Sequence, residues 1–313
     1  MTGQRPHGIG RRGLPAAAAA WTALPWPPLP WPPLPWATRP ARAAAGRVVC
    51  IGAALTECVF ALGEGPHLVA RDSSSRFPAA ALALPDIGYM RALPPEGIAS
   101  LSPDLVILSE EAGPAEAVAV LRATGLPMRT LPDGAGPGAA EAKLRGVGAA
   151  LGRDAEPVAR QVAADWAMLD APLAGLRARP RVLFVLSLAR GAPLVSGEGT
   201  HADAAIAAAG GVNPVRGWRG YRPLSAESAA TLAPDVILMM DFALQEAGGA
   251  AAVFATPALA VTPAARAGRV VALDGGLMLG FGPRAAHGRR ALAALLHPDA
   301  ALPPLPERPW TAA

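Results

Sequence analysis

The sequence is poor in lysine: Lys143 is the single lysine among 28 lysine and arginine residues. Its formal net charge is nevertheless +4. Five arginines and no acid fall in residues 1–43, and taking those five charges from +4 leaves −1 for the remainder, where acids and bases are mixed. A nucleic-acid-binding face requires lysine and arginine clustered together. We therefore expect no nucleic-acid partner and assign the basic character to the N-terminal segment.

Cysteine is also scarce, with Cys50 and Cys58 alone in the chain. Their spacing excludes a CxxC redox pair, and their number excludes a Cys-rich zinc site. Cys50 falls in an apolar strand pattern and Cys58 in the helical pattern that follows it, so we expect both to be buried free thiols. A disulfide between them stays open, since the spacing does not demand one.

The N-terminal segment has the pattern of an export signal. Arg11 and Arg12 precede an apolar stretch, and Ala41-Arg42-Ala43 fits a cleavage site of the A-x-A type. Residues 1–45 are therefore expected to be an export signal with a Pro/Trp-rich repeat, by the general secretory or the twin-arginine route. A low-complexity linker or a misplaced start codon is the alternative. No later stretch approaches the ~20 apolar residues of a membrane helix, so we expect the mature protein to be soluble. Together with the export signal, this predicts a periplasmic location.

The sequence motifs that usually carry catalysis are missing. There is no GxSxG elbow, no HExxH, no Walker loop and no GxGxxG after a predicted strand. Two glycine-rich runs, at residues 134–138 and 280–282, predict turns, because the first lacks a phosphate-binding lysine and the second is too short. We therefore expect a binding protein and no enzyme. An exported α/β enzyme with an unrecognised site is the alternative from another class.

Short apolar runs alternate with helical patterns after residue 46. Near-continuous apolar runs are typical of parallel strands covered on both faces, and they occur at residues 47–52, 67–71, 105–109 and 128–131. Helical patterns at 55–62 and 114–124 lie between them. This alternation predicts a parallel α/β sheet with right-handed crossovers.

The same pattern starts again at residue 181 and contains an internal repeat. SLSPDLVIL at residues 100–108 matches TLAPDVILM at 231–239, and a Gly-Tyr pair stands upstream of each. Glu96 and Glu227 each lie eight residues before the aspartate of their own repeat. Two similar α/β lobes are therefore expected, at residues 46–138 and 177–298.

Residues 139–176, between the lobes, are predicted to be helical. Gly152 can end a first segment, and Asp154 can cap a second. From residue 155 to residue 176 a continuous helix would span about 33 Å at ~1.5 Å per residue. The expected fold is two Rossmann-like α/β lobes joined by a single long helix, with a ligand cleft between them, followed by a proline-rich tail at 299–313.

Five segments together carry a family resemblance. They are RVVCIGAALTECVFALGEG, LPDIGYMRALPPEGIASLSPDLVILSE, SGEGTHADAAIAAAGGVNPV, GYRPLS and GFGPR. Over nearly all of residues 46–298 they resemble the haem-binding branch of the cluster-type III periplasmic binding proteins. The resemblance implies a protein that binds ferric haem and delivers it to an ABC permease and its ATPase. The TE…ALG and LSPDLV parts are shared with siderophore and cobalamin carriers, which remain the alternative, whereas GYMRAL points to haem.

Tyr89 is the iron ligand that this resemblance implies, because the tyrosine of the GYMRAL segment coordinates haem iron in that family. A phenolate is a hard anionic ligand that favours ferric iron. A free phenol titrates near ~10, so it needs the iron and a nearby cation to ionise at neutral pH. Arg91 can supply that cation or hold a haem propionate through forked hydrogen bonds. An ordinary half-buried tyrosine beside an exposed arginine is the alternative.

The chain's other tyrosine, Tyr221, is the counterpart in the second repeat. We expect it to close over the macrocycle or to hydrogen-bond a propionate, with Arg222 beside it; a loop tyrosine packed at a lobe edge is the alternative. Trp218 can stack on the ring or serve packing. Some haem binders of the family use a histidine of the second lobe, and His201 is the candidate, against a role at the start of a helix. The second axial ligand and the choice between one haem and two stay open.

Glu96 and Glu227 have a different role by resemblance. In this superfamily one glutamate on each lobe meets arginines of the permease, so that both lobes dock together. Equivalent positions on two lobes suit a two-fold transporter. The alternative is that both are glutamates favoured at helix N-termini by the helix dipole, and the two roles are compatible.

Overall fold

The computed structural model describes residues 46–188 and 192–312, so the predicted export signal lies outside the described residues. The first part of the chain forms a four-stranded sheet in the order β2-β1-β3-β4, and every pairing is parallel. The strands are β1 (Val48–Ile51), β2 (Leu68–Arg71), β3 (Leu105–Ser109) and β4 (Met128–Leu131). The parallel sheet predicted here is confirmed, and each strand begins and ends within one residue of its predicted bounds.

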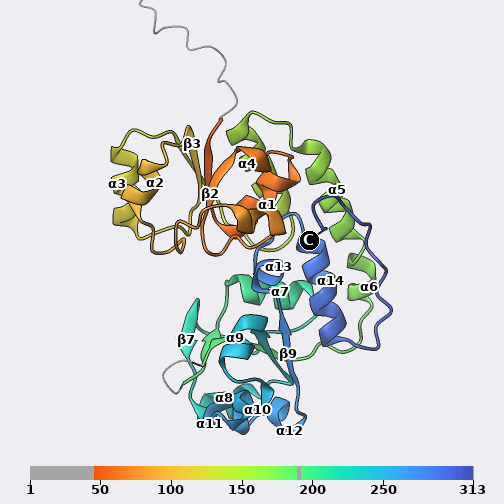
Figure 1. The fold of residues 1–313 in the computed structure, drawn as a ribbon. Helices are drawn as coiled ribbons and strands as arrows, with labels where there is room; N and C mark the ends of the chain where they lie inside the picture. Colours follow the sequence, from red (N-terminus) through yellow and green to blue (C-terminus); the bar gives the residue numbers. More distant parts are fainter. Residues whose placement is uncertain (1–45, 189–191, 313) are drawn as a thin grey trace, which may run out of the picture. The chain divides into compact units, whose positions relative to one another are not determined.

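Helices cover both faces of this sheet, which explains the continuous apolar runs of its strands (Figure 1). One face carries α1 (Ala53–Ala61) and α4 (Ala139–Leu151), and the other carries α2 (Pro95–Ser100) and α3 (Ala115–Ala123). Within β1, Val48 and Cys50 belong to the first of these cores, while Val49 and Ile51 belong to the second. Side chains of a strand alternate between faces, so a strand buried on both sides must be apolar throughout.

The second part of the chain forms a five-stranded sheet in the order β7-β6-β5-β8-β9. Its strands are β5 (Val182–Ser187), β6 (Leu194–Ser196), β7 (Tyr221–Pro223), β8 (Val236–Met240) and β9 (Val270–Leu273). β5 pairs parallel with β8, as predicted, and β8 pairs parallel with β9, a strand that was not predicted from the sequence. β6 pairs antiparallel with both β5 and β7. The sequence pattern did not reveal β6 and β7, because each has only three residues and β7 ends in a proline that an edge strand tolerates.

Short helices surround this second sheet. They are α7 (His201–Ala208), α8 (Ala226–Leu232), α9 (Asp241–Glu246), α10 (Ala250–Ala255), α11 (Pro257–Ala260), α12 (Pro263–Arg266), α13 (Gly275–Leu279) and α14 (Ala285–Leu296). Two 3₁₀ turns, Gly65–His67 and Ala79–Ala83, flank β2 in the first lobe. Within the described ranges, no helix combines the length and apolar character needed to cross a bilayer.

The internal repeat has the same hydrogen bonds in both lobes. The backbone N–H of Arg47 donates to the Asp104 carboxylate at 2.9 Å, and the N–H of Arg181 donates to Asp235 at 2.8 Å. Each of these arginines also donates from its guanidinium to a carbonyl at the end of the helix that precedes the aspartate. Arg47 donates to Leu101, just past the end of α2, at 2.8 Å, and Arg181 donates to Leu232, the last residue of α8, at 2.7 Å. The Pro-Asp motif therefore fastens the start of one strand to the start of its neighbour in each lobe.

Residues 139–176 form three helices, α4, α5 (Glu156–Ala167) and α6 (Asp170–Ala174). Gly152 ends α4 in the left-handed conformation, as predicted. The N-cap position of α5 is Ala155, one residue after the expected Asp154, and no side chain caps the helix there. The Asp154 carboxylate still accepts a hydrogen bond of 2.9 Å from the N–H of Glu156 at the start of α5.

The continuous helix expected from residue 155 to residue 176 is divided at Met168 and Leu169. Pro172 gives the physical reason, since it has no N–H to donate to the carbonyl of Met168 four residues earlier. The apolar stripe nevertheless holds, because Val162 packs in the first-lobe core while Leu169 and Leu173 pack in the second-lobe core. The segment thus contacts both lobes, as the sequence predicts, through two helices instead of one.

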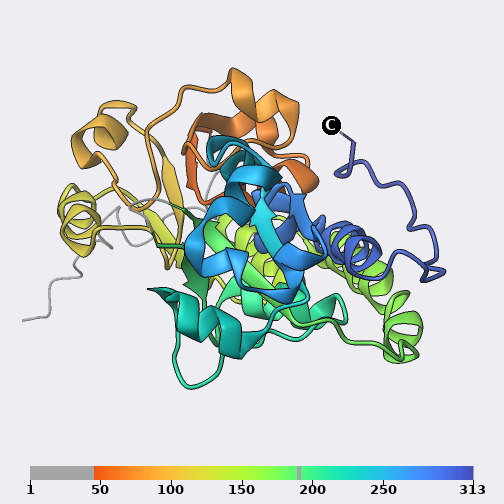
Figure 2. The same cartoon turned by 90° about the horizontal axis from the view of Figure 1, so that it is seen from below.

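The proline-rich C-terminal tail runs beside α14 and α5 (Figure 2). Arg308 donates two hydrogen bonds of 2.7 and 3.0 Å to the buried carboxylate of Asp165 on α5. Trp310 packs against the first-lobe core, and Leu302 and Leu305 pack against the second-lobe core. The tail is therefore a packed part of the structure that contacts both lobes.

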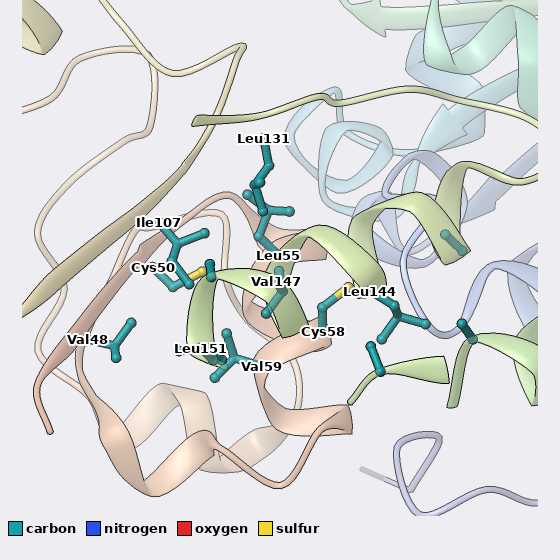
Figure 3. Packing of buried hydrophobic residues seen from close by; sticks show 14 of the residues in the cluster. Val48, Cys50, Leu55, Cys58, Val59, Ile107, Leu131, Leu144, Val147 and Leu151 are labelled. Atoms are coloured by element: carbon teal, nitrogen blue, oxygen red, sulfur yellow. The ribbon is translucent and has the colours of Figure 1, made fainter. Parts of the chain in front are cut away.

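Cys50 and Cys58 are both free and fully buried, as expected from the sequence. Figure 3 shows their sulfur atoms apart from one another within the core, with Cys50 beside Ile107 and Cys58 beside Leu144. Burial raises the pKa of Cys50 to about 12 and raises that of Cys58 well above its ordinary value. Both thiols are thus protonated at neutral pH and act as small apolar side chains.

Candidate functional site

Tyr89 lies on a loop that follows β2 and whose backbone is held in place. The Asp86 carboxylate accepts hydrogen bonds of 2.8 Å from the N–H of Gly88 and from the Ser73 hydroxyl. The N–H of Ser73 donates in turn to the Gly88 carbonyl at 2.9 Å. Gly88 has a φ of 95°, which glycine adopts without strain. Tyr89 itself is 51% exposed, so a fixed backbone presents an accessible phenol.

A buried carboxylate fastens this loop to the end of the first sheet. Asp72 accepts hydrogen bonds from the N–H of Gly52 at 2.9 Å, from the N–H of Ser74 at 3.0 Å and from the Ser75 hydroxyl at 2.6 Å. Gly52 joins β1 to α1, and the serines precede the Tyr89 loop. The Ser74 hydroxyl also bonds to Asp72 and lies 3.9 Å from the Met90 sulfur. The residues next to Tyr89 are therefore supported from the carboxyl ends of β1 and β2.

Arg91 is paired with Glu111, a residue that the sequence analysis did not single out. The Arg91 Nη2 atom lies 2.7 Å from Glu111 Oε2. Glu111 follows β3, and the side chains that follow parallel strands gather at one edge of a sheet. An acidic residue just past the end of a predicted strand is the signal that was available in the sequence.

Tyr221 begins the edge strand β7, where it pairs with Ser196 of β6, so it is not the loop tyrosine of the alternative interpretation. Its ring packs edge-on against Phe184 of β5, with 6.4 Å between ring centroids. Burial raises the pKa of Tyr221; the charge of Arg91 opposes this rise and the charge of Glu111 adds to it. Both charges belong to the first lobe, so the pKa of Tyr221 depends on residues of the other lobe.

Trp218 and Arg222 lie together on the second lobe. The Arg222 guanidinium is 5.5 Å from the centre of the Trp218 ring. The indole packs so closely on Gly197 that a β-carbon there would lie 2.3 Å from the ring. One face of Trp218 thus serves packing, which was one of its two expected roles.

His201 is the first residue of α7, where Thr200 caps the helix by accepting the N–H of Asp203 at 3.0 Å. The His201 Nε2 atom lies 3.6 Å from Asp133 Oδ1, and its ring is 6.1 Å from that of Phe281. This placement agrees with the expected role at a helix start and gives the imidazole an acidic neighbour from the first lobe.

Asp133 has a second partner in Lys143, the single lysine. The Nζ atom of Lys143 lies 3.0 Å from Asp133 Oδ1. It also donates hydrogen bonds to the carbonyls of Gly134 and Gly280 at 2.6 and 3.0 Å. Burial alone would raise the pKa of Asp133, but His201 and Lys143 lower it well below its usual range. Lys143 therefore joins α4 and the loop after β4 to the second lobe.

Glu57 and Arg284 form another contact between the lobes. The pairing was not predicted from the sequence, although the segments TEC and GFGPR contain the two residues. Arg284 also stacks on Phe77 of the first lobe, 3.5 Å from the ring centre. These contacts fasten the α1 end of the first lobe to the start of α14.

Glu96 and Glu227 occupy equivalent positions on the two lobes. Each lies in the first turn of a short helix, α2 for Glu96 and α8 for Glu227, and each is exposed. Neither forms an ion pair with another described residue. Both carboxylates are therefore accessible to a partner and lie close to the positive end of a helix dipole.

The arrangement is suited to binding an anionic ligand. An accessible phenol, Tyr89, and a cation, Arg91, lie two residues apart on the same segment of the first lobe, and the charge of Arg91 acts on the pKa of Tyr221 in the second lobe. The described ranges contain no group of three or more His, Cys, Asp or Glu side chains that could hold a metal ion by themselves. A phenolate can contribute one ligand to an iron that brings its own equatorial ligands, as a porphyrin does.

Comparisons with known proteins show which family the chain belongs to. The profile of a family described as "Periplasmic binding protein" matches residues 48–276. The structure of the periplasmic haem-binding protein BhuT in complex with two haems has a TM-score of 0.75 and 43% identity, covering 80% of this chain and 97% of that one. RhuT from Roseiflexus sp. RS-1, a periplasmic haem-binding protein in apo form, has a TM-score of 0.78 and 38% identity, covering 81% and 98%.

A third solved structure is similar over the same region. HutB of Vibrio cholerae, described as a periplasmic haem-binding protein, has a TM-score of 0.70 and 33% identity, covering 80% of this chain and 99% of that one. No curated protein matches the sequence. Since the family profile spans most of the chain and relatives above 30% identity are covered almost completely, this chain belongs to the periplasmic binding protein family.

Proposed function

We propose that this protein captures ferric haem in the periplasm and delivers it to an ABC import permease driven by an ATPase. The observation that carries the proposal is the accessible Tyr89, held on a fixed backbone two residues before Arg91. Relatives with 43%, 38% and 33% identity are described as haem-binding proteins, which supports haem over a siderophore or cobalamin.

In this proposal each site residue has one task. Tyr89 coordinates the ferric iron as a phenolate, and Arg91 supplies positive charge beside the anionic ligand. Tyr221 closes on the macrocycle from the second lobe, with Arg222 and Trp218 at its rim. His201 is the candidate for a second axial ligand. The protein carries out no covalent chemistry on its cargo.

The domain organisation follows from the same proposal. Residues 46–138 and 177–298 are the two lobes, residues 139–176 join them, and residues 299–313 brace them. Residues 1–45 are the signal that directs export and is then removed. Glu96 and Glu227, exposed at equivalent positions, dock the two lobes onto the permease together.

An absorption titration of the purified protein with ferric haem tests the proposal. We expect a saturable complex with the spectrum of high-spin, tyrosinate-bound ferric haem. In Tyr89→Phe that spectrum disappears, because phenylalanine has no oxygen to coordinate iron. Tyr221→Phe serves as the matched control, since it removes the other hydroxyl and leaves the iron ligand.

Other results would change the proposal in defined ways. Saturable binding with an unchanged spectrum in Tyr89→Phe keeps haem as the cargo and moves the iron ligand to His201 or Tyr221. If the wild-type protein gives no saturable spectrum, haem is excluded, and the same titration is repeated with a ferric siderophore and with cobalamin.

A further inference from the structure

The ion pair between Arg91 and Glu111 is built by the backbone around it. The N–H of Gly113 donates to the Met90 carbonyl at 2.9 Å, and the N–H of Leu93 donates back to the Gly113 carbonyl at 2.9 Å. On the other side, the N–H of Glu111 donates to the Ser109 hydroxyl at 3.0 Å. The loop after β3 is thus fastened to the Tyr89 segment, and this places the carboxylate beside the guanidinium.

This ion pair contributes little to the stability of the fold. The side chains of Arg91 and Glu111 are 55% and 46% exposed, and exposed ion pairs are weak because water competes for both charges. Arg91 binds Glu111 through Nη2 only. A guanidinium presents five N–H donors in a fork that fits a carboxylate at two points. Another carboxylate can therefore replace Glu111 at low cost and with better geometry.

The position of the pair connects it to the ligand site. Arg91 lies two residues after Tyr89, and the backbone bonds of Met90 and Leu93 to Gly113 hold Glu111 beside the same segment. A ligand held by Tyr89 therefore lies close to this pair. Ferric haem carries two propionate carboxylates, which compete with Glu111 for the same guanidinium.

We propose that Glu111 is a specificity-determining residue that occupies Arg91 in the free protein and yields it to a carboxylate of the entering ligand. This inference rests on the proposed haem function. The positive charge of Arg91 is therefore paired with a carboxylate in both states, with Glu111 in the free protein and with the ligand in the complex. The exchange favours ligands that bring a carboxylate, because a ligand without one leaves the Arg91–Glu111 pair in place.

The test compares two ligands, ferric haem and its dimethyl ester, in which both carboxylates are blocked. Glu111→Gln keeps the size of the side chain and removes its charge. We expect it to bind ferric haem about two- to fivefold tighter, the effect of removing one exposed competing ion pair. Its affinity for the dimethyl ester stays unchanged. In the Arg91→Met background, Glu111→Gln has no effect on either ligand, because the residue through which it acts is gone.

Glu110→Gln is the matched control for net charge. Glu110 is the exposed neighbour of Glu111, and its Oε1 accepts the N–H of Asp133 at 2.8 Å, a bond that glutamine retains. We expect Glu110→Gln to leave the affinities of both ligands unchanged. The inference is overturned if Glu110→Gln tightens haem binding as much as Glu111→Gln does. It is also overturned if Glu111→Gln changes both ligands alike, or if its effect persists in Arg91→Met.

The same titration separates this inference from the proposed function. Wild-type protein that binds no ferric haem sinks the proposed function, and the inference with it. Wild-type protein that binds haem through Tyr89, with Glu111→Gln indistinguishable from it, leaves the proposed function standing and overturns the exchange at Arg91 alone.

Discussion

Arg284 and Glu57 are 227 residues apart in the chain and form a two-point ion pair. Arg284 Nε donates to Glu57 Oε2 at 2.9 Å, and Nη2 donates to Oε1 at 2.5 Å. The two side chains are 11% and 7% exposed. Glu57 is on α1 and Arg284 directly precedes α14, so the pair joins the first lobe to the second.

Arg284→Met should destabilise the protein by about 3 kcal/mol, because it leaves the Glu57 carboxylate buried without a counter-charge. Urea unfolding at neutral pH measures this loss. Arg145→Met is the control, since Arg145 pairs with Glu156 at an exposed site and its loss should change the unfolding free energy little. Equal losses in the two variants would contradict the importance of the pair between the lobes.

The effect of Arg284→Met should depend on pH. Burial raises the pKa of Glu57, and Arg284 opposes that rise, so the variant has a still higher pKa. A carboxyl group whose pKa is raised by folding destabilises the folded state at pH values above that raised pKa. The destabilisation decreases as the pH falls below the raised pKa and disappears below the ordinary pKa of 4.5. The difference in unfolding free energy between the variant and the wild type should therefore shrink on acidification. A difference that grows between pH 7 and pH 5 would contradict this.

Lys143→Met should also destabilise the protein, by about 3 kcal/mol, because it leaves the largely buried Asp133 carboxylate without its ammonium partner. It also removes the donor to the carbonyls of Gly134 and Gly280. Since Gly280 is in the second lobe, amide exchange at Gly280 and Phe281 should accelerate along with the loss of stability. Unchanged exchange there would show that Lys143 stabilises α4 alone.

Asp86→Asn should loosen the Tyr89 loop without unfolding the lobe. The N–H of Gly88, the Ser73 hydroxyl and Arg71 lower the pKa of Asp86 below its ordinary 3.8. A lowered carboxyl pKa contributes stability that is present above the ordinary value and is lost as pH falls through the folded-state value. In the wild type we expect the protection of the Gly88 amide from exchange to weaken only in strong acid. In the variant it should already be weaker at neutral pH, and an equally protected amide would refute the role given to Asp86.

Glu96→Ala combined with Glu227→Ala should separate binding from delivery. Both carboxylates are exposed, so we expect haem affinity in solution to stay the same. Uptake into vesicles that contain the permease and its ATPase should fall by about tenfold or more, because truncating one partner of a charge pair buried at an interface costs ~2 kcal/mol or more.

The control for this experiment is Glu116→Ala, which removes an exposed acid from the first turn of α3. It alters net charge and a helix N-terminus in the same way, at a position without an equivalent in the repeat. Uptake should stay at the wild-type rate in this variant. A loss of uptake there as large as in the double variant would assign the effect to general charge.

Local sequence patterns were sufficient for most of the secondary structure. The four strands of the first sheet were predicted to within one residue, because parallel strands buried on both faces are apolar throughout. The repeat around Asp104 and Asp235 was visible because the same backbone hydrogen bonds require the same residues in each lobe. The strands β6 and β7 escaped prediction, since three residues hold too little periodicity, and β9 was not predicted either.

The sequence by itself therefore determined the two lobes, the helical connection and the segment that carries Tyr89 and Arg91. Only the tertiary structure decided the partners of these residues: Glu111 for Arg91, Glu57 for Arg284, and Asp133 for both Lys143 and His201. Helix and strand periodicity depends on neighbours along the chain, so it can be read locally. The partner of a charged side chain depends on which strand ends the crossovers bring to the same edge and on how the two lobes contact each other, and no local pattern encodes that.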